Sequence, residues 1–294
     1  MTEEGSRLDF RDMTEADLAD GLRLSRASGW NQTLEDWRRL LSLGPGLFRA
    51  AVEDGRIVAS GGAVRYGDAL AWVCMILVEP ERRGHGLGTR IFDEVLARCE
   101  AGVRAGRLRC VGLDATPAGR GIYLQRGFVD GGPPPGLVRM RAERAAPGGR
   151  PGGVVPLAGP GLDAVLRRDR EVFGADRGAL LRWALAGAPD LARVVREGDR
   201  VRGYCFGRHG DHSDHLGPVV AEDAAAAQDL VAATLWSSRG RPLILDARVE
   251  PGWLAALARL GFGEQRPFTR MYRGEARPAA LPALEPVVFG PEFG

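Results

Sequence analysis

The clearest hydrophobic pattern in the chain runs from Met75 to Cys99. A short apolar run at residues 75–78 stops just before Pro80, and a run of this length with this stop favours a buried strand over a helix. From Ile91 onward the apolar residues recur at the spacing of one helical face. A polar, glycine-rich segment, residues 83–88, lies between them. The pattern therefore predicts a strand, a glycine-rich turn and an amphipathic helix.

The same patterns predict further elements on both sides of this stretch. Thr14 and Thr33 stand where each would cap a helix, and Asp54-Gly55 is a strong signal for a tight hairpin turn. In chain order the predicted elements are a strand at 8–11, helices at 14–24 and 33–41, strands at 48–52, 57–64 and 70–78, the helix after the glycine-rich turn, a strand at 108–113, a helix at 121–125, and a last hairpin from Gly127 to Met140.

The glycine-rich turn has the chemistry of an anion site. Glycine permits positive φ and a close approach of the backbone to a ligand, and the N–H groups and dipole at a helix N-terminus favour negative charge. The segment is not a P-loop, because that motif ends in Gly-Lys-Ser/Thr and the chain contains no lysine. Gly84, Gly86 and Gly88 do not match the spacing of the dinucleotide fingerprint either. The turn is therefore expected to hold a phosphate-bearing ligand of another kind.

Residues 83–88, Arg-Gly-His-Gly-Leu-Gly, resemble the acyl-CoA signature of the GNAT superfamily of N-acyltransferases, Q/R-x-x-G-x-G/A, at every fixed position. A Val-x-Pro sequence precedes them at 78–80, as is common in that family. The order of predicted elements over residues 8–141 is also similar to the GNAT fold. The resemblance implies an α/β (α+β) fold, with a central, mixed but mostly antiparallel sheet flanked by helices.

The resemblance also implies acetyl-CoA as a cosubstrate and no metal. In that fold a bulge in the strand before the turn exposes backbone to the pantetheine arm, a role that would fall on Ile76, Leu77 and Val78. The backbone amides of the turn would hold the pyrophosphate; these belong to Arg83, Gly84, His85, Gly86, Leu87, Gly88 and Thr89. Thr116 stands where some relatives carry an asparagine that contacts the cofactor.

Tyr123 is the candidate general acid. It lies four residues before Gly127-Phe128 and so matches a Y-x-x-x-G-F pattern of many GNAT enzymes, which implies a phenol that protonates the leaving thiolate. The alternative is a packing tyrosine whose hydroxyl finds a local partner.

The general base is less well defined by the sequence. Many relatives use a glutamate on the strand before the signature, but residues 69–78 contain no acid, and Glu79 is expected to face solvent. Asp114 is the best-placed candidate to accept the proton of the amine. Two alternatives stay open: Asp114 caps the turn that follows it, or a chain of waters takes the proton.

Trp30 and Asn31 are candidate substrate-binding residues. With Gln32 they lie in the loop between the first two predicted helices, which by resemblance covers the acceptor site, and an aromatic beside two amides could hold a small polar molecule. The alternative is a helix-entry contact with a solvated cap.

The second half of the chain repeats the pattern of the first. Asp246 corresponds to Asp114, Gly261-Phe262 to Gly127-Phe128, and Arg270-Met271 to Arg139-Met140. The repeat lacks the chemistry, however. Glu222 and Asp223 replace the glycine-rich turn and would repel a pyrophosphate, and Leu257 replaces the tyrosine. We therefore expect a degenerate copy that braces the first domain or shapes its acceptor pocket.

These assignments give the predicted domain organisation. Residues 1–145 form a catalytic domain, and residues 146–161, rich in proline and glycine, form a linker. Residues 162–275 form the degenerate copy. Residues 276–294 form a tail whose apolar run at 287–289 adds a strand or covers a sheet edge.

Three histidines in the second half need a separate explanation. His209, His212 and His215 are spaced by three with two aspartates between them, which is compatible with a metal site. Gly207 and Gly210 argue against the helix that such a spacing would need, so we expect a polar hairpin loop and no metal. A contribution to acceptor recognition is the second alternative.

Composition narrows the functional classes. The chain is 45% hydrophobic and 27% charged, with a net charge of +2, as is ordinary for a globular protein. Its arginines are scattered among acids, so no nucleic-acid partner is expected. No apolar run is long enough to span a membrane, and the N-terminal residues do not form a signal segment. Four cysteines without paired spacing favour a reduced, cytoplasmic protein.

The sequence thus predicts a tandem GNAT N-acetyltransferase that transfers an acetyl group to a primary amine of a small molecule. A protein or peptide amine is an alternative acceptor, and a non-catalytic acyl-CoA sensor is an alternative function. Either a monomer or a homodimer is compatible with the sequence.

Overall fold

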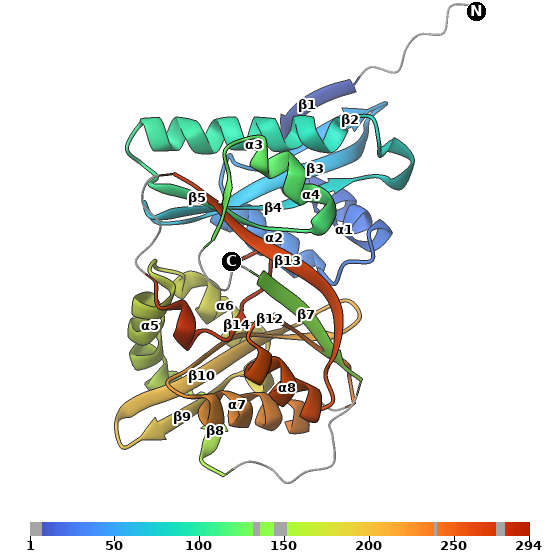
Figure 1. Ribbon diagram of the computed structural model, residues 1–294. Coiled ribbons are helices and arrows are strands. Elements are labelled where there is room, and N and C mark those ends of the chain that lie inside the picture. The colour runs from blue at the N-terminus through green and yellow to red at the C-terminus, as the bar shows by residue number, and fades with distance from the viewer. Residues whose placement is uncertain (1–7, 132–135, 144–151, 238–239, 275–279) are drawn as a thin grey trace, which may run out of the picture. The chain divides into compact units, whose positions relative to one another are not determined.

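The computed structural model describes residues 8–131, 136–143, 152–237, 240–274 and 280–294 (Figure 1). These residues cluster into two compact units, residues 1–112 and residues 113–294, and each unit is described by itself. The division falls before the linker that the sequence predicts, and the domain boundaries at 145/146 and 161/162 stay a prediction.

The first unit is a sheet covered by helices. Its strands are ordered β1-β2-β3-β4-β5; the first four are antiparallel, and β4 and β5 pair in parallel. Helix α3 lies on one face, and α1 and α2 lie on the other (Figure 1). The elements are β1 (Leu8–Asp12), α1 (Leu18–Ala27), α2 (Leu34–Leu43), β2 (Arg49–Glu53), β3 (Arg56–Tyr66), β4 (Leu70–Val78), α3 (Leu87–Arg104) and β5 (Cys110–Ala115), whose last three residues belong to the second unit.

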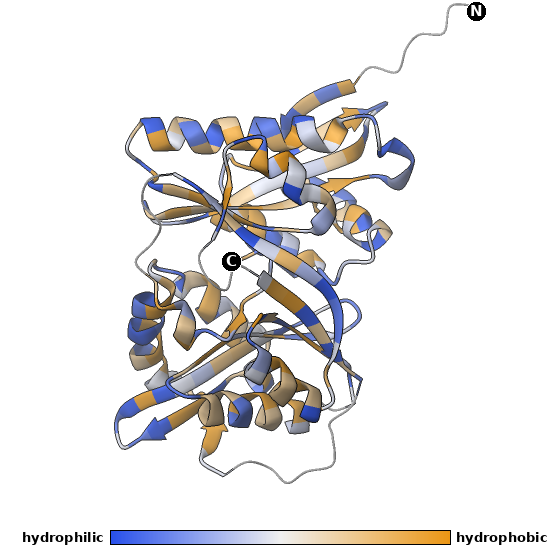
Figure 2. Cartoon of the chain, viewed as in Figure 1, coloured by the Kyte–Doolittle hydropathy of each residue, from blue (hydrophilic) through white to orange (hydrophobic). Residues whose placement is uncertain are grey.

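Local signals explain most of these elements. Asp54 and Gly55 both have positive φ, 49° and 79°, as the hairpin between β2 and β3 requires. The hydroxyl of Thr33 accepts a hydrogen bond from the N–H of Asp36, which closes the first turn of α2. Figure 2 shows hydrophobic and hydrophilic residues alternating along α3, and the apolar face buries Ile91, among others, against β3.

The second unit is a larger sheet with helices on both faces. Along the sheet its strands follow the order β13-β7-β12-β14-β11-β10-β9-β8. The elements are α4 (Pro117–Leu124), β6 (Val129–Asp130), β7 (Gly136–Ala142), β8 (Val154–Pro156), α5 (Gly159–Phe173), α6 (Gly178–Gly187), β9 (Arg193–Glu197), β10 (Arg200–His209), β11 (Asp214–Ala221), α7 (Ala224–Ser237), β12 (Leu243–Arg248), α8 (Pro251–Arg259), β13 (Gly263–Arg273) and β14 (Val287–Val288).

Strand β7 pairs differently from the sequence-based expectation. The sequence predicts a hairpin from Gly127 to Met140, but β6 and β7 do not pair with each other; both pair with β13, and β7 also pairs with β12. Strand β13, in turn, is the neighbour of β5. The last strands of the two sequence repeats are therefore exchanged. Strand β13 of the second repeat lies beside β5 of the first, and β7 of the first repeat lies beside β12 of the second.

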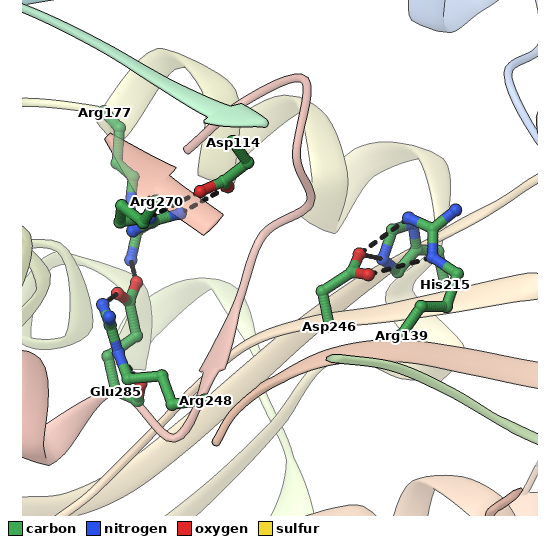
Figure 3. Close-up of polar contacts among 8 residues, drawn as sticks. All are labelled: Asp114, Arg139, Arg177, His215, Asp246, Arg248, Arg270 and Glu285. Atoms are coloured by element: carbon green, nitrogen blue, oxygen red, sulfur yellow. Dashed lines mark hydrogen bonds and ion pairs between the residues drawn. The ribbon is translucent and has the colours of Figure 1, made fainter. Parts of the chain in front are cut away.

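Two buried ion pairs mark this exchange (Figure 3). Asp114 on β5 binds Arg270 on β13 through both carboxylate oxygens, at 2.9 and 2.8 Å. At the corresponding position of the repeat, Asp246 on β12 binds Arg139 on β7 at 2.9 and 2.7 Å. In both pairs the arginine side chain is 6% exposed and the aspartate is fully buried.

The C-terminal segment forms part of the sheet. Strands β11 and β12 pair in parallel only over Asp214–Leu216 and Leu243–Leu245, after which β14 lies between them and pairs with both. The carboxylates of Glu285 and Glu292 anchor the segment in buried pairs with Arg177 and Arg208.

The predicted linker is only partly an irregular segment. Residues 146–151 lie outside the described residues. Residues 154–156, however, form β8, which pairs with β9, and α5 begins at Gly159. The side chain of Val154 is buried at 3% exposure, so an apolar contact gives this segment a fixed place despite its glycines and prolines.

We expect Arg139→Met to lower the free energy of unfolding by about 3 kcal/mol, because it leaves the carboxylate of Asp246 buried without its guanidinium partner. The measurement is urea denaturation. Arg182→Met is the control: it removes the cation of an ion pair whose side chains are 56% and 75% exposed, and it should cost less than about 1 kcal/mol. Equal effects of the two variants would contradict a structural role for the buried pair.

Candidate functional site

A bulge interrupts β4 immediately before the glycine-rich turn. Ser60 and Gly62 on β3 pair with Leu77 and Cys74, so β4 has one extra residue between them. Met75 takes up the bend with φ of 56°, a value that few non-glycine residues adopt, and its carbonyl accepts a hydrogen bond from the Ser60 hydroxyl at 3.2 Å. The bulge that the resemblance implies is therefore present.

The backbone beyond the bulge is only partly engaged by neighbouring strands. The parallel ladder between β4 and β5 ends at Trp72 and Gly112, whereas β4 continues to Val78. Gly61 on β3 allows the side chain of Ile76 on β4 to pack closely against β3, because a Cβ at Gly61 would lie 2.6 Å from Cδ1 of Ile76. On the side of β5, the ladder therefore does not include the last segment of β4, which contains Ile76, Leu77 and Val78.

The glycine-rich turn leads directly into the N-terminus of α3. Gly84 and Gly86 have φ of 82° and 75°, and Gly86 is the N-cap residue. No side chain accepts a hydrogen bond at this cap, and the first turn of α3 contains no acid. The side chain of Leu87 is buried, while Gly84, His85 and Gly86 are exposed. Helix α3 therefore begins at Leu87 without a side-chain cap for its first N–H groups, which belong to Leu87, Gly88 and Thr89.

This geometry fits a phosphate-bearing ligand. An added Cβ at Gly84 or Gly86 would meet nothing within 4 Å, so the backbone borders open space there. At Gly88 a Cβ would lie 3.2 Å from Cγ2 of Val78, so this glycine lets helix and strand approach. Helix N–H groups and the helix dipole both favour an anion at this place.

Arg83, the first residue of the turn, and Glu79, which precedes the turn, both have polar partners. The guanidinium of Arg83 donates to the carbonyl of Val78 and to the hydroxyl of Ser28, both at 3.1 Å, and so ties the turn to β4 and to the end of α1. The prediction that Glu79 faces solvent is wrong, because its side chain is only 12% exposed. It is paired with Arg23 at 2.6 Å and with Arg56, and these cations offset its negative charge next to the glycine-rich turn.

The equivalent helix of the second half is closed. Asp223 precedes α7, and its carboxylate accepts a hydrogen bond from the N–H of Ala226 at 2.8 Å. This bond and the neighbouring Arg202 lower the pKa of Asp223 despite some desolvation. A negatively charged side chain therefore caps this helix, whereas no side chain caps α3 in the first half. Strand β14 also fills the gap between β11 and β12.

Tyr123 stands in the last turn of α4. Gly127, with φ of 75°, ends the helix, and the N–H of Phe128 donates to the carbonyl of Tyr123 at 3.1 Å. Gly119 leaves space for the phenol, because a Cβ there would lie 3.2 Å from its oxygen. Burial raises the pKa of Tyr123 to about 12.

The second half repeats this helix end without the phenol. The N–H of Phe262 donates to the carbonyl of Leu257 at 3.1 Å, and Gly261 has φ of 96°. Leu257 itself is fully buried in the core. The Y-x-x-x-G-F spacing is thus explained by a helix end, and only the first half places a polar group there.

Asp114 and Thr116 have structural partners. Both carboxylate oxygens of Asp114 accept hydrogen bonds from Arg270; burial raises the pKa of Asp114, and the guanidinium opposes that shift. This pairing favours a structural role over that of a base. Thr116 is the N-cap of α4, and its hydroxyl accepts from the N–H of Gly119 at 3.3 Å. Arg270 was not predicted as the partner of Asp114, although the sequence repeat matches Arg270 to Arg139.

The loop between α1 and α2 is more buried than a solvated cap would be. Asn31 and Gln32 are 6% and 3% exposed, while Trp30 is half-buried. Within the first unit the structure thus brings together the bulge, the glycine-rich turn and this loop, which contacts the turn through Ser28 and Arg83. Asp114, Thr116 and Tyr123 belong to the second unit.

The three histidines have separate environments. His209 ends β10 and contacts Asp214 and Asp190, and His212 lies beside Asp211. His215 is buried between Arg208 and Asp246. Among the described residues no group of three or more His, Cys, Asp or Glu side chains could hold a metal ion. No described helix is long and apolar enough to cross a membrane.

Comparisons with known proteins match this architecture. Residues 11–128 match the acetyltransferase (GNAT) family, and residues 165–281 match a second acetyltransferase (GNAT) domain. The chain is similar to holothin acyltransferase of Pseudoalteromonas sp. (strain SANK 73390), with 29% identity over 251 residues that span 85% of this chain and 82% of the relative.

Solved structures share the fold over nearly the whole chain. A putative acetyltransferase from Pyrococcus horikoshii superposes with a TM-score of 0.79 at 21% identity, covering 100% of this chain and 98% of that one. A tandem GNAT protein from the clavulanic acid biosynthesis pathway superposes with a TM-score of 0.60 at 15% identity, covering 91% and 98%.

Asp114→Asn separates the structural from the catalytic role of this residue. We expect it to lower the free energy of unfolding by about 3 kcal/mol, because Arg270 is left buried without a counter-charge. The control is Asp130→Asn, since Asp130 also binds an arginine, Arg120, through both oxygens, but on the surface; denaturation should show little change. Unaltered stability of Asp114→Asn with a large loss of kcat would instead identify the base.

Proposed function

Because this chain belongs to the GNAT superfamily of acyltransferases and carries two of its domains in tandem, we propose that its first half transfers an acetyl group from acetyl-CoA to a primary amine. The observation that carries the proposal is the uncapped N-terminus of α3, with its glycines at positive φ. The acyltransferase relative supports acyl transfer. The acceptor we propose is a small molecule, because a whole second domain accompanies the catalytic one.

Binding rests mainly on the backbone. The amides of Arg83 to Thr89 hold the pyrophosphate, and the exposed edge of Ile76 to Val78 orients the pantetheine arm. These donors are fixed before the ligand arrives, so little ordering is required on binding. Acetyl-CoA, when bound, supplies an acyl group activated as a thioester. Trp30 and Asn31, on the loop that contacts the turn through Ser28, hold the acceptor amine.

The transfer step forms the C–N bond and breaks the C–S bond. Backbone N–H groups polarise the thioester carbonyl, and binding both partners on one scaffold supplies the orientation. Tyr123 keeps its proton at neutral pH, since its pKa is raised, and donates it to the departing sulfur. Because Asp114 is held by Arg270, we assign the removal of the amine proton to water.

The cofactor site is tested by two isosteric variants, Gly86→Asn and Gly86→Asp. Asn and Asp both tolerate the left-handed conformation of Gly86 better than most residues do, so the pair isolates the effect of one negative charge at the helix N-terminus. We expect calorimetry with acetyl-CoA to show Gly86→Asp binding at least tenfold more weakly than Gly86→Asn, with a smaller difference at high salt.

Each outcome of this comparison is informative. Equal affinity of the two folded variants would place the cofactor elsewhere. Binding by the wild type without transfer to any amine of a panel would favour an acyl-CoA sensor, as the absence of an acid in β4 allows. Transfer to peptides but not to small amines would change the acceptor class and leave the cofactor site intact.

Tyr123→Phe tests the proposed acid. We expect kcat to fall by about 10²–10⁴-fold, with Tyr272→Phe as the control for loss of another phenol in the same unit. Because burial holds the pKa of Tyr123 at about 12, the phenol stays protonated as pH rises, so the wild type should show no loss of kcat from this group between pH 7 and 10. A fall of less than threefold would restrict Tyr123 to packing.

A further inference from the structure

The arginines around the glycine-rich turn differ in whether a carboxylate offsets their charge. Arg23 binds the carboxylate of Glu79 at 2.6 Å, and Arg56 binds the same carboxylate. Arg82, just before the turn, is paired with Glu53. The charge of each of these cations is therefore offset within the protein before any ligand arrives.

Arg90, in the first turn of α3, has no such partner. Its backbone N–H donates to the carbonyl of the N-cap residue Gly86 at 3.0 Å, so it lies one turn, a rise of about 5.4 Å, after the cap. Its side chain is exposed, and it makes no ion pair or hydrogen bond with another residue that the structure describes. Because helix side chains lean toward the N-terminus of their helix, this cation stands next to the turn.

The ring of Phe10 on β1 holds the Arg90 guanidinium in place. The guanidinium carbon Cζ lies over the ring, 3.8 Å from its centroid. Phe10 is itself half-buried and packs against the cluster that contains Leu87 and Ile91 of α3. An aromatic face attracts a cation but offers no lone pair to its N–H groups. The contact therefore orients Arg90 and leaves its hydrogen-bond donors for a ligand.

Acetyl-CoA carries one phosphate that the proposed backbone contacts leave without a partner. Its pyrophosphate is assigned to the amides of Arg83 to Thr89, but a further phosphate is attached to the 3′ oxygen of the ribose. As a monoester, this group has a charge of about −1.5 to −2 at pH 7, and arginine can bind it through two parallel N–H···O bonds. The guanidinium of Arg83 is less suited, because it already donates to Val78 and Ser28.

We propose that Arg90, oriented by Phe10, binds the 3′-phosphate of the acyl-CoA donor. The proposal rests on the proposed binding of acetyl-CoA in the first half, and it adds a charged side chain to a site made mainly of backbone. It also specifies the donor class. A phosphopantetheine arm attached to a carrier protein lacks the 3′-phosphate, so this contact favours free acyl-CoA.

A cycle of two ligands and two proteins tests the contact. The ligands are acetyl-CoA and acetyl-3′-dephospho-CoA, which differ only in the 3′-phosphate, and the proteins are the full-length wild type and Arg90→Gln. In calorimetry we expect the wild type to prefer acetyl-CoA by about 10-fold, as a hydrogen bond between charged groups allows. Arg90→Gln should weaken acetyl-CoA alone and so remove most of this preference. The preference of the wild type should shrink at high salt, because the pair is exposed.

Three further variants separate the parts of this contact. Arg104→Gln is the matched control: it removes a 69% exposed arginine from the last turn of the same helix, roughly 21 Å further along the axis, and should leave the preference unchanged. Arg90→Lys keeps the charge but not the planar donor fork, so its preference should be intermediate. Phe10→Leu should lower the preference about 2- to 5-fold, as the loss of a cation–π contact allows.

The results that overturn this contact differ from those that overturn the cofactor site. If the wild type binds both ligands with equal affinity, the 3′-phosphate contact is refuted and the cofactor site stands. The contact is also refuted if Arg90→Gln weakens both ligands equally, which would assign Arg90 to the pyrophosphate, or if it leaves the preference unchanged. Absence of binding of either ligand to the folded wild type would overturn the proposed function together with the contact.

Discussion

The second unit depends on two buried aspartate–arginine pairs that bind its exchanged strands together. Charge removed from water costs several kcal/mol per ion, and the cost is offset only when the partner is present with good geometry. Asp114 and Asp246 each meet this condition through two hydrogen bonds from an arginine that the other sequence repeat supplies. Without the exchange, Asp114 would lie opposite Arg139 and Asp246 opposite Arg270. The observed pairs therefore indicate which strands are adjacent.

The two halves share a backbone plan and differ in how each begins one helix. Helix α3 starts at a glycine with no side-chain cap, whereas α7 starts at an aspartate whose carboxylate accepts from its own backbone. The first arrangement leaves donors for a ligand anion, and the second satisfies them internally. A small change at a helix N-terminus therefore decides whether the first amides are capped by a side chain, while the helix end at Gly127 or Gly261 is retained.

Local features of the fold were predictable from the sequence, and partner choice was not. The Asp54-Gly55 turn, the Thr33 cap and the glycine-rich turn each follow from residues within a few positions of one another. The partner of β7 does not follow from nearby residues. Strand β7, with Arg139-Met140, and strand β13, with Arg270-Met271, have equivalent sequences, so either could pair with β5 or with β12. The pairing of Asp114 with Arg270 has the same origin. The burial of Asn31 and the ion pairs of Glu79 depend on distant residues, which a local pattern does not encode.

The place of these partners in the chain has a consequence for synthesis on the ribosome. Arg270 follows Asp114 by 156 residues, which at about 5–20 residues per second is a delay of roughly 8–30 s. During that time β7 and the end of β5 have no exchanged strands beside them, and their apolar faces and strand edges are exposed to other nascent chains. The segment with Glu285, β14 and Glu292 is made later still, and β14 pairs with β11 and β12. The unit therefore exposes unpaired strand edges, which favour aggregation, until β12, β13 and β14 have been made.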